Sequence, residues 1–98
     1  MGLKDFRTHT MAVEFYKECR RLKLPAYIKD QLLRASSSIA LNLAEGSGKE
    51  TINDQNRFYK YSLTSLREVQ SILELEDINH LKAKADHLGA CLYKLTAR

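Results

Sequence analysis

The segment Gly46-Ser47-Gly48-Lys49 invites comparison with the glycine-rich loop that binds nucleotide phosphates. That loop needs a glycine five positions before the glycine that precedes the lysine, and a serine or threonine directly after the lysine. The sequence has Leu43 and Glu50 at those two positions, and a helical pattern precedes the segment where a strand is required. We therefore interpret the segment as the end of a helix followed by a turn.

Some helical bundles hold metal ions through inward carboxylates and Glu-x-x-His motifs. Asp77-Ile78-Asn79-His80 is the nearest approximation to such a motif, and it falls where one helix is expected to end. The apolar stripes described below supply no inward carboxylate. His80 and His87 lie two helical turns apart, roughly 10 Å, which is too far for both to bind one ion. We expect no metal site and no other cofactor.

The nucleophilic side chains lack the neighbours that catalysis requires. Cys19 and Cys91 lie on or beside apolar stripes, as free core cysteines usually do, and we find no histidine at a spacing that would activate either one. The serines at 36–38 lack the strand-turn-helix context of a nucleophile elbow and suit a close contact between helices. We therefore predict that the protein is not an enzyme.

Basic residues gather near the two ends of the sequence. Overall, 16 Lys and Arg exceed 12 Asp and Glu, which gives a net charge of +4 and an isoelectric point near 9.2. Eight basic and four acidic residues give +4 in 1–34, four and seven give −3 in 35–78, and four and one give +3 in 79–98. Such basic regions bind nucleic-acid phosphates without reading sequence; the alternative is a solvated surface whose charges pair with acidic neighbours. The candidate nucleic-acid-binding residues are Lys17, Arg20, Arg21, Lys23, Lys82, Lys84 and Lys94.

Basic and aromatic residues alternate over residues 57–61, as they do on surfaces that stack nucleic-acid bases. Phe58 falls on the predicted apolar stripe of its helix and is therefore expected in the core. Tyr59 points off that stripe, where it either stacks a base or fills an interface between subunits. We favour the interface.

Four segments with helical periodicity position these residues. In each one, apolar residues recur at steps of three and four, which places them on one helical face. The segments span about residues 8–22, 28–45, 51–76 and 79–95. The predicted stripes of the first, third and fourth segments are Ala12, Phe15, Cys19 and Leu22; Phe58, Ser62, Ser65, Val69 and Ile72; and Leu81, Ala85, Leu88, Leu92 and Leu95. Four glycines and one proline are too few for the turns of an all-β fold, and short connections make successive helices antiparallel neighbours. We predict an all-α fold with a single domain over residues 1–98, an up-down-up-down antiparallel four-helix bundle.

The helix boundaries carry their own signals. Pro25 suits the first turn of a new helix, and Gly46 suits the left-handed position that follows a helix. Thr51 is expected to cap the third helix, with Asp54 at the third position of that helix. Asp77 or Asn79 is expected to cap the fourth helix.

The second helix carries two stripes rather than one. Its main stripe contains Ile28, Leu32, Ala35, Ile39 and Asn42, and its further stripe of apolar or small residues contains Leu33, Ser37, Leu41 and Ala44. A helix with two such stripes packs on two sides, and a chain this short offers few elements to cover both. We therefore expect a second subunit on one side, with Leu33, Leu41 and Tyr59 at the interface.

Several motifs resemble a known family. They are Gln31-Leu32-Leu33-Arg34-Ala35, Ser38-Ile39, Asn42-Leu43-Ala44-Glu45-Gly46, Arg57-Phe58, Ser65-Leu66-Arg67-Glu68, Ala12-Val13-Glu14-Phe15 and Leu24-Pro25. Together they resemble the signature of four-helix-bundle proteins encoded by intervening sequences in bacterial 23S rRNA genes. The resemblance covers most of the chain and implies a bundle that assembles as a homopentamer. Similar bundles act as accessory proteins of the reverse transcriptases of diversity-generating retroelements.

The motif residues also have a structural interpretation. Asn42 falls on an apolar stripe, where an unpaired amide costs roughly 1–3 kcal/mol, so we expect it to hydrogen-bond a neighbouring helix or a helix end. Glu45 lies in a last helical turn, which disfavours acids, so it should have a specific partner. We also expect Arg34 and Glu68 to pair across the second hairpin. The full set of motif residues is Gln31, Arg34, Asn42, Glu45, Gly46 and Glu68.

The sequence thus predicts a non-enzymatic homo-oligomer, pentameric by resemblance, that binds RNA or DNA through basic faces. It would act as an accessory to a nucleic-acid-processing protein. The alternative is a protein-binding scaffold without affinity for nucleic acid. The first ten residues lack the apolar core of a signal peptide, and no apolar run approaches the ~20 residues of a membrane span. With cysteines expected to be reduced, we predict a cytoplasmic protein that does not contact membranes.

Overall fold

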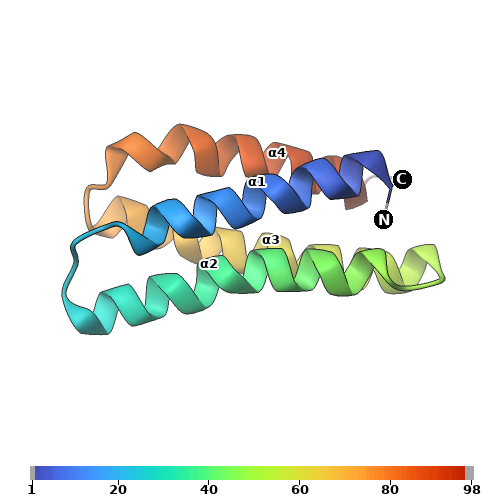
Figure 1. Cartoon of the computed structure of the whole chain (residues 1–98), viewed down its shortest axis with the longest axis horizontal. Helices are drawn as coiled ribbons and strands as arrows, with labels where there is room; N and C mark the ends of the chain where they lie inside the picture. The colour runs from blue at the N-terminus through green and yellow to red at the C-terminus, as the bar shows by residue number, and fades with distance from the viewer. Residues whose placement is uncertain (1, 97–98) are drawn as a thin grey trace.

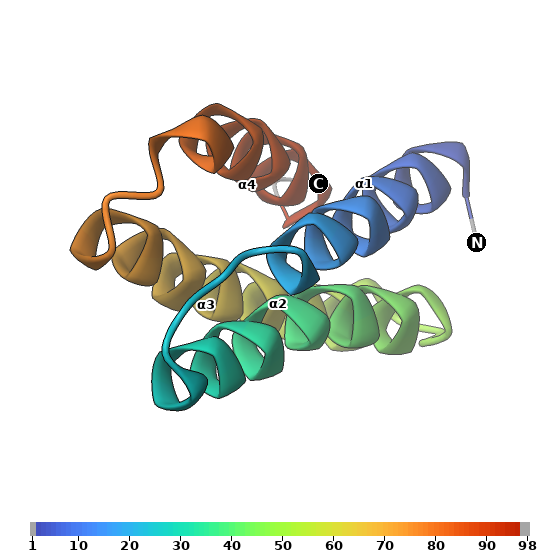
Figure 2. The ribbon, with the colours of Figure 1, turned by 60° about the vertical axis from the view of Figure 1, so that its left-hand side comes forward.

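A computed structural model describes residues 2–96 and shows four α-helices in that range (Figure 1). They are α1 (Leu3–Arg20), α2 (Ala26–Ser47), α3 (Ile52–Leu75) and α4 (Lys82–Thr96), and a 3-10 turn, η1 (Asn79–Leu81), precedes α4. Each helix packs against the next one, and α4 packs against α1. The four helices run alternately up and down, so α1 begins at the end of the bundle where α4 finishes (Figures 1 and 2). The predicted all-α four-helix bundle is confirmed.

The core follows the predicted stripes in three of the four helices. The buried residues of α1 include Ala12, Phe15 and Cys19, and those of α4 are Ala85, Leu88, Leu92 and Leu95. In α2, the main stripe is buried from Ile28 to Ile39. None of the helices within residues 2–96 combines the length and the hydrophobicity needed to cross a lipid bilayer.

The third helix is rotated relative to the prediction. Tyr59, predicted to point away from the core and toward another subunit, is completely buried inside its own bundle, whereas Phe58 is only half-buried. Ser62, Val69 and Ile72 of the predicted stripe are buried, and Leu66 and Leu73 join them. The assignment of Tyr59 to a subunit interface is therefore wrong, because no part of its ring is exposed to a second chain.

Gly46 explains why the ring of Tyr59 fits inside. A Cβ atom at Gly46 would lie 2.7 Å from Cε1 and 2.9 Å from Cδ1 of Tyr59, and 3.1 Å from the backbone oxygen of Gln55. The residue is buried inside α2, which continues to Ser47. The prediction that Gly46 adopts a left-handed conformation is wrong, because none of the glycines within 2–96 has a positive φ. The glycine is needed for space.

The second hairpin is joined by hydrogen bonds between small polar side chains. Ser62 Oγ donates to the backbone oxygen of Ile39 at 2.8 Å, and Ser65 Oγ donates to Ser38 Oγ at 2.9 Å. Asn42 Nδ2 donates to both the backbone oxygen and Oγ of Ser38, each at 2.9 Å. The direct partner of Asn42 therefore lies within its own helix, and not in a neighbouring helix or at a helix end as expected; Ser38 connects Asn42 to Ser65 of α3.

The start of α3 agrees with the prediction, and its end differs from it. Thr51 caps the helix as predicted, since its Oγ1 accepts a hydrogen bond from the Asp54 N–H at 3.1 Å. At the other end, Ile78 N–H donates to Leu73 O at 2.8 Å and Asp77 N–H donates to Glu74 O at 3.3 Å. This is a Schellman motif with Asp77 in the left-handed position, at φ 55°. Asp77 closes α3 and does not cap the fourth helix, and Ile78 occupies the capping position of η1 in place of Asn79.

Candidate nucleic-acid interface and the groove between α1 and α4

A groove runs along the outside of the bundle between α1 and α4. Because the two helices are antiparallel, two stripes with steps of three and four residues face each other across it. From α1 and its C-terminal cap come Lys4, Arg7, Met11, Glu14, Glu18 and Arg21, and from η1 and α4 come His80, Lys84, His87, Cys91 and Lys94. Three hollows follow one another along this groove and share residues where they meet. Each end of the groove is basic, and acids occupy its middle.

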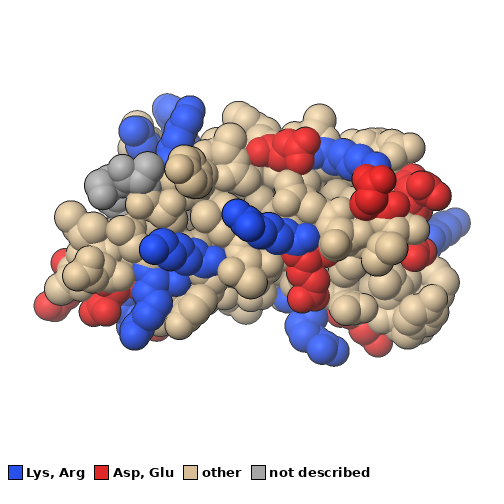
Figure 3. Space-filling model, turned by 180° about the vertical axis from the view of Figure 1, so that it is seen from behind, with Lys and Arg blue, Asp and Glu red and all other residues tan. Residues whose placement is uncertain are grey.

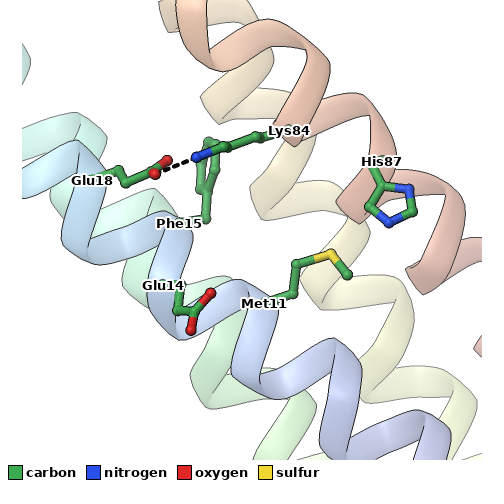
Figure 4. A pocket seen from close by; sticks show the side chains of 6 residues that line it. All are labelled: Met11, Glu14, Phe15, Glu18, Lys84 and His87. Carbon is green, nitrogen blue, oxygen red and sulfur yellow. Dashed lines mark hydrogen bonds and ion pairs between the residues drawn. The ribbon is translucent and has the colours of Figure 1, made fainter.

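The middle of the groove is closed by an ion pair. Glu18 on α1 pairs with Lys84 on α4 through Oε1 and Nζ. Figure 4 shows this pair above the ring of Phe15, with Glu14 and Met11 further along α1 and His87 on the opposite side. The second carboxylate oxygen of Glu18 is buried without a hydrogen bond from any residue in 2–96. The charge of Lys84, a predicted phosphate contact, is thus largely engaged within the chain.

Three predicted nucleic-acid-binding residues do gather on one surface. A shallow hollow at the C-terminal end of α1 is lined by Lys17, Arg20 and the capping residue Arg21, and its lining includes no acidic residue. The guanidinium of Arg20 lies 6.0 Å from the centre of the Tyr16 ring, which helps to hold it in place. Lys23 follows in the exposed connection to α2. Within residues 2–96 none of these four cations forms an ion pair. We call Lys17, Arg20, Arg21 and Lys23 the α1 basic cluster.

The three lysines predicted on α4 do not form one surface. Lys82 pairs with Glu74 of α3 at 2.7 Å, and this hydrogen bond and charge lower the pKa of the exposed Glu74 carboxyl. Lys84 faces α1 as described, whereas Lys94 lies near the other end of the helix. The side of the molecule seen in Figure 3 accordingly shows basic and acidic side chains interspersed, not a continuous basic surface.

Lys94 belongs to a second basic group that sequence reasoning missed. Lys4 and Arg7 on the first turns of α1 line the same hollow as Lys94 and His87 of α4. The signal for this group lay in the topology, because an up-down-up-down bundle brings the start of its first helix beside the end of its last. Counting charges along the chain did not use that information.

Cys91 also lines this hollow, and its surroundings differ from the prediction. We found no histidine at an activating spacing, yet His87 precedes Cys91 by one helical turn and its Nε2 lies 4.0 Å from the Cys91 Sγ. Cys19, in contrast, is buried beside Ser36, and burial raises the pKa of its thiol to about 11. Residues 2–96 contain no group of three or more His, Cys, Asp or Glu side chains placed to hold a metal ion.

The opposite side of the molecule, formed by α2 and α3, carries most of the motif residues. Glu45 has the specific partner expected of it, since it pairs with Lys49 at 3.2 Å. Gln31, Arg34 and Glu68 are exposed. The predicted pairing of Arg34 with Glu68 is wrong within the chain, because neither forms an ion pair with any residue in 2–96.

Exposed residues on this side repeat at intervals of seven. Along α2 they are Tyr27, Arg34 and Leu41, and along α3 they are Tyr61, Glu68 and Leu75. The exposed fractions of the apolar ones are 75% for Tyr27, 68% for Leu41, 48% for Tyr61 and 72% for Leu75. Since Ser38 touches Ser65, the antiparallel geometry sets Leu41 level with Tyr61 and Arg34 level with Glu68. We call these six residues the heptad strips. Of the predicted interface residues, Leu41 lies in a strip, while Leu33 is half-buried against the core.

The aromatic residues at this surface are Phe58 and Tyr61, and not Tyr59 as predicted. Their rings meet edge to face with centres 5.6 Å apart. The Lys49 ammonium lies 5.1 Å and the Arg57 guanidinium 5.2 Å from the centre of the Phe58 ring. Basic and aromatic side chains therefore do lie together at this surface, as the sequence indicated. The aromatic residue that contacts the cations is Phe58, and not Tyr59.

The described part of the chain is a small all-helical bundle with basic residues gathered on α1. Comparison with known families is more specific. The model of the 23S rRNA-intervening sequence protein family matches residues 5–94, and the chain belongs to that family. No curated protein and no solved structure matches it.

Proposed function

We propose that this protein is a non-enzymatic, cytoplasmic accessory factor that binds RNA or DNA through the α1 basic cluster and acts as a homo-oligomer. The observation that carries the proposal is that Lys17, Arg20 and Arg21 share one acid-free hollow and remain without an ion pair within residues 2–96. Free cations held close together suit a phosphate backbone, because each one displaces a condensed counterion. Lys82 and Lys84 are less suited, since each already pairs with an acid.

Contacts between these cations and the phosphate backbone of a nucleic acid give affinity without sequence specificity. Lys23 extends the cluster into the connection before α2, and Tyr16 supports Arg20 from behind. The accessory role follows from the family resemblance, which associates similar bundles with nucleic-acid-processing proteins. We expect such a partner protein to supply the sequence specificity that these residues do not provide.

Filter binding across a salt series tests the proposal. The double variant Arg20→Gln/Arg21→Gln should weaken binding and reduce the slope of log affinity against log salt by about 1.4–1.8, since each lost contact accounts for about 0.7–0.9. The matched control is Lys60→Gln/Arg67→Gln, which removes the same charge from exposed positions of α3. Equal losses in the two double variants would show that net charge alone attracts nucleic acid.

The heptad strips support the proposed oligomer, in which a second copy of this chain packs against the α2–α3 side. Aromatic and aliphatic residues at intervals of seven are the pattern that packs helices against helices. Tyr27, Leu41, Tyr61 and Leu75 leave this pattern exposed in a single chain. Arg34 and Glu68 carry opposite charges at the same level without pairing within residues 2–96, so they suit pairing between copies. The family resemblance favours five copies.

A protein-binding scaffold without nucleic-acid affinity is the second candidate, and the same heptad strips favour it. Mass determination in solution, with and without nuclease treatment, separates the two. An oligomer whose mass falls after nuclease treatment, together with salt-dependent binding, supports the first function. An oligomer of unchanged mass with no affinity for RNA or DNA at low salt supports the scaffold.

A further inference from the structure

The hollow at the Lys4–Lys94 end of the groove combines a thiol with positive charge and apolar surface. It encloses about 280 Å³ between the first turns of α1 and the last turns of α4, and mostly apolar atoms line it. Lys4, Arg7 and Lys94 are exposed at its edge, and Met11 and Leu95 contribute to its walls. None of these three cations forms an ion pair with another residue of the described chain.

Cys91 does not stand alone in this hollow. Its Sγ lies 4.0 Å from Nε2 of His87, one turn earlier on the same helix, and it is partly exposed. The other cysteine provides a contrast within the same chain. Cys19 is 0% exposed and touches no hollow of this groove, and burial disfavours its thiolate. One thiol is therefore accessible in a cationic setting, and the other is protected in an apolar one.

We propose that this hollow is a modification site in which Cys91 forms mixed disulfides with small anionic disulfides. The Cys91 thiolate attacks one sulfur of the disulfide RS–SR, the Sγ–S bond forms, and the S–S bond breaks. The leaving RS⁻ carries away the electron pair of the broken bond. The proton of the Cys91 thiol passes to water or to the nearby His87 imidazole. The disulfide is the oxidant, so the step needs no other reactant.

The charge around the thiol determines which disulfides react. Lys4, Arg7 and Lys94 attract a carboxylate-bearing disulfide and stabilise the negative charge shared by the sulfurs during exchange. The apolar walls accept the carbon chain of the reagent. A cationic disulfide is repelled by the same three side chains. This inference is independent of the proposed function, because it requires neither nucleic acid nor a second subunit.

The test compares two disulfides of opposite charge on the full chain: oxidised glutathione, which is anionic, and cystamine, which is cationic. Intact mass and peptide mapping follow the adducts on Cys91 and Cys19. For each reagent, the rate is divided by that of the same chain unfolded in urea, which removes the intrinsic reactivity of the reagent. We expect oxidised glutathione to modify folded Cys91 at least roughly threefold faster, on this scale, than cystamine does. High salt should remove most of that preference.

Variants identify the responsible charges. Arg7→Gln and Lys94→Gln should each lower the rate with oxidised glutathione by roughly threefold and leave the rate with cystamine equal or higher. Lys60→Gln, an exposed lysine of α3, is the matched control and should change neither rate. Cys91→Ala should abolish the adduct, and circular dichroism verifies that each variant is folded. Equal normalised rates for the two reagents, or modification of Cys19 as fast as Cys91, would overturn the proposal.

Discussion

At the scale of single residues, the closest fit in the molecule is that between Gly46 and the ring of Tyr59. We predict that Gly46→Ala destabilises the protein by about 1–3 kcal/mol, because the new methyl group would lie 2.7 Å from the ring of a fully buried side chain. The backbone oxygen of Gln55, at 3.1 Å, limits the movement that could relieve the clash. Urea unfolding followed by circular dichroism measures the change.

Gly48 provides the matched control two residues later. A Cβ there would meet only backbone oxygens at 3.6 and 3.8 Å, and its φ of −87° suits any residue. Gly48→Ala should therefore be neutral or stabilise the protein by about 0.5 kcal/mol. A similar loss of stability in both variants would contradict the steric explanation and point to a general requirement for flexibility in this turn.

The buried thiol of Cys19 predicts a specific dependence of stability on pH. Burial raises its pKa from the ordinary 9.0 to about 11 in the folded protein. The unfolded chain therefore releases this proton more readily, and the free energy of unfolding should fall as pH rises from 9 to 11. One pKa unit corresponds to about 1.4 kcal/mol, which limits this contribution to about 3 kcal/mol.

The comparison between Cys19→Ala and the unchanged chain isolates this contribution from other groups that titrate in the same range. The variant should lose less stability between pH 9 and 11 in urea unfolding. Parallel curves for the two proteins would contradict a buried, protonated Cys19.

At the scale of the helices, the end of α3 carries the one positive φ of a non-glycine residue within 2–96. Asp77, at φ 55°, occupies the position of the Schellman motif that glycine prefers. We predict that Asp77→Gly stabilises the protein by about 0.5–1 kcal/mol, because glycine adopts this conformation without steric cost. Glu76→Gly, at φ −99°, should destabilise the protein instead. Thermal unfolding measures whether each variant is more or less stable than the unchanged chain. A lower unfolding temperature in both variants would exclude backbone strain at Asp77.

Helical periodicity was sufficient to predict the four helices and their order, but not the rotation of α3. Phe58 and Tyr59 are both large aromatics at adjacent positions, so the local pattern accommodates either one in the core. What decides between them is Gly46, thirteen residues before Tyr59, which leaves room for the Tyr59 ring across the hairpin. A stripe read along one helix does not contain that information, because the space belongs to the opposite helix.

The candidate site, like the fold, could be predicted from the sequence only in part. The α1 basic cluster could be predicted because its four members follow one another within seven residues. The pairing of Lys84 with Glu18 could not, since the two lie 66 positions apart and meet only through the packing of α4 on α1. The basic hollow around Cys91 was missed for the same reason, although the predicted topology already placed Lys4 and Lys94 at one end of the bundle.

At the scale of the whole molecule, the two sides of the bundle have different chemistry. The α1–α4 side carries a groove with basic ends and the α1 basic cluster, whereas the α2–α3 side carries the heptad strips. In the proposed assembly, contacts through the α2–α3 side would leave the cations of α1 exposed on every copy. Five copies at +4 each would carry a net charge of +20, which binds a polyanion far more strongly than a single bundle does.

Reversing the charges of Arg34 and Glu68 tests how the copies meet. We predict that Arg34→Glu alone and Glu68→Arg alone each weaken the assembly, because each sets like charges opposite one another. The double variant should restore it. An exposed ion pair contributes only about 0.2–1 kcal/mol, but a closed ring repeats the contact at every interface, so a change at each interface produces a measurable loss of mass. Sedimentation over a range of protein concentrations follows the dissociation.

Lys94→Glu reverses a charge on the opposite side and should leave the oligomer intact. If the double variant dissociates as readily as the single ones, Arg34 and Glu68 do not pair between copies, and the apolar residues of the heptad strips must direct the assembly without them.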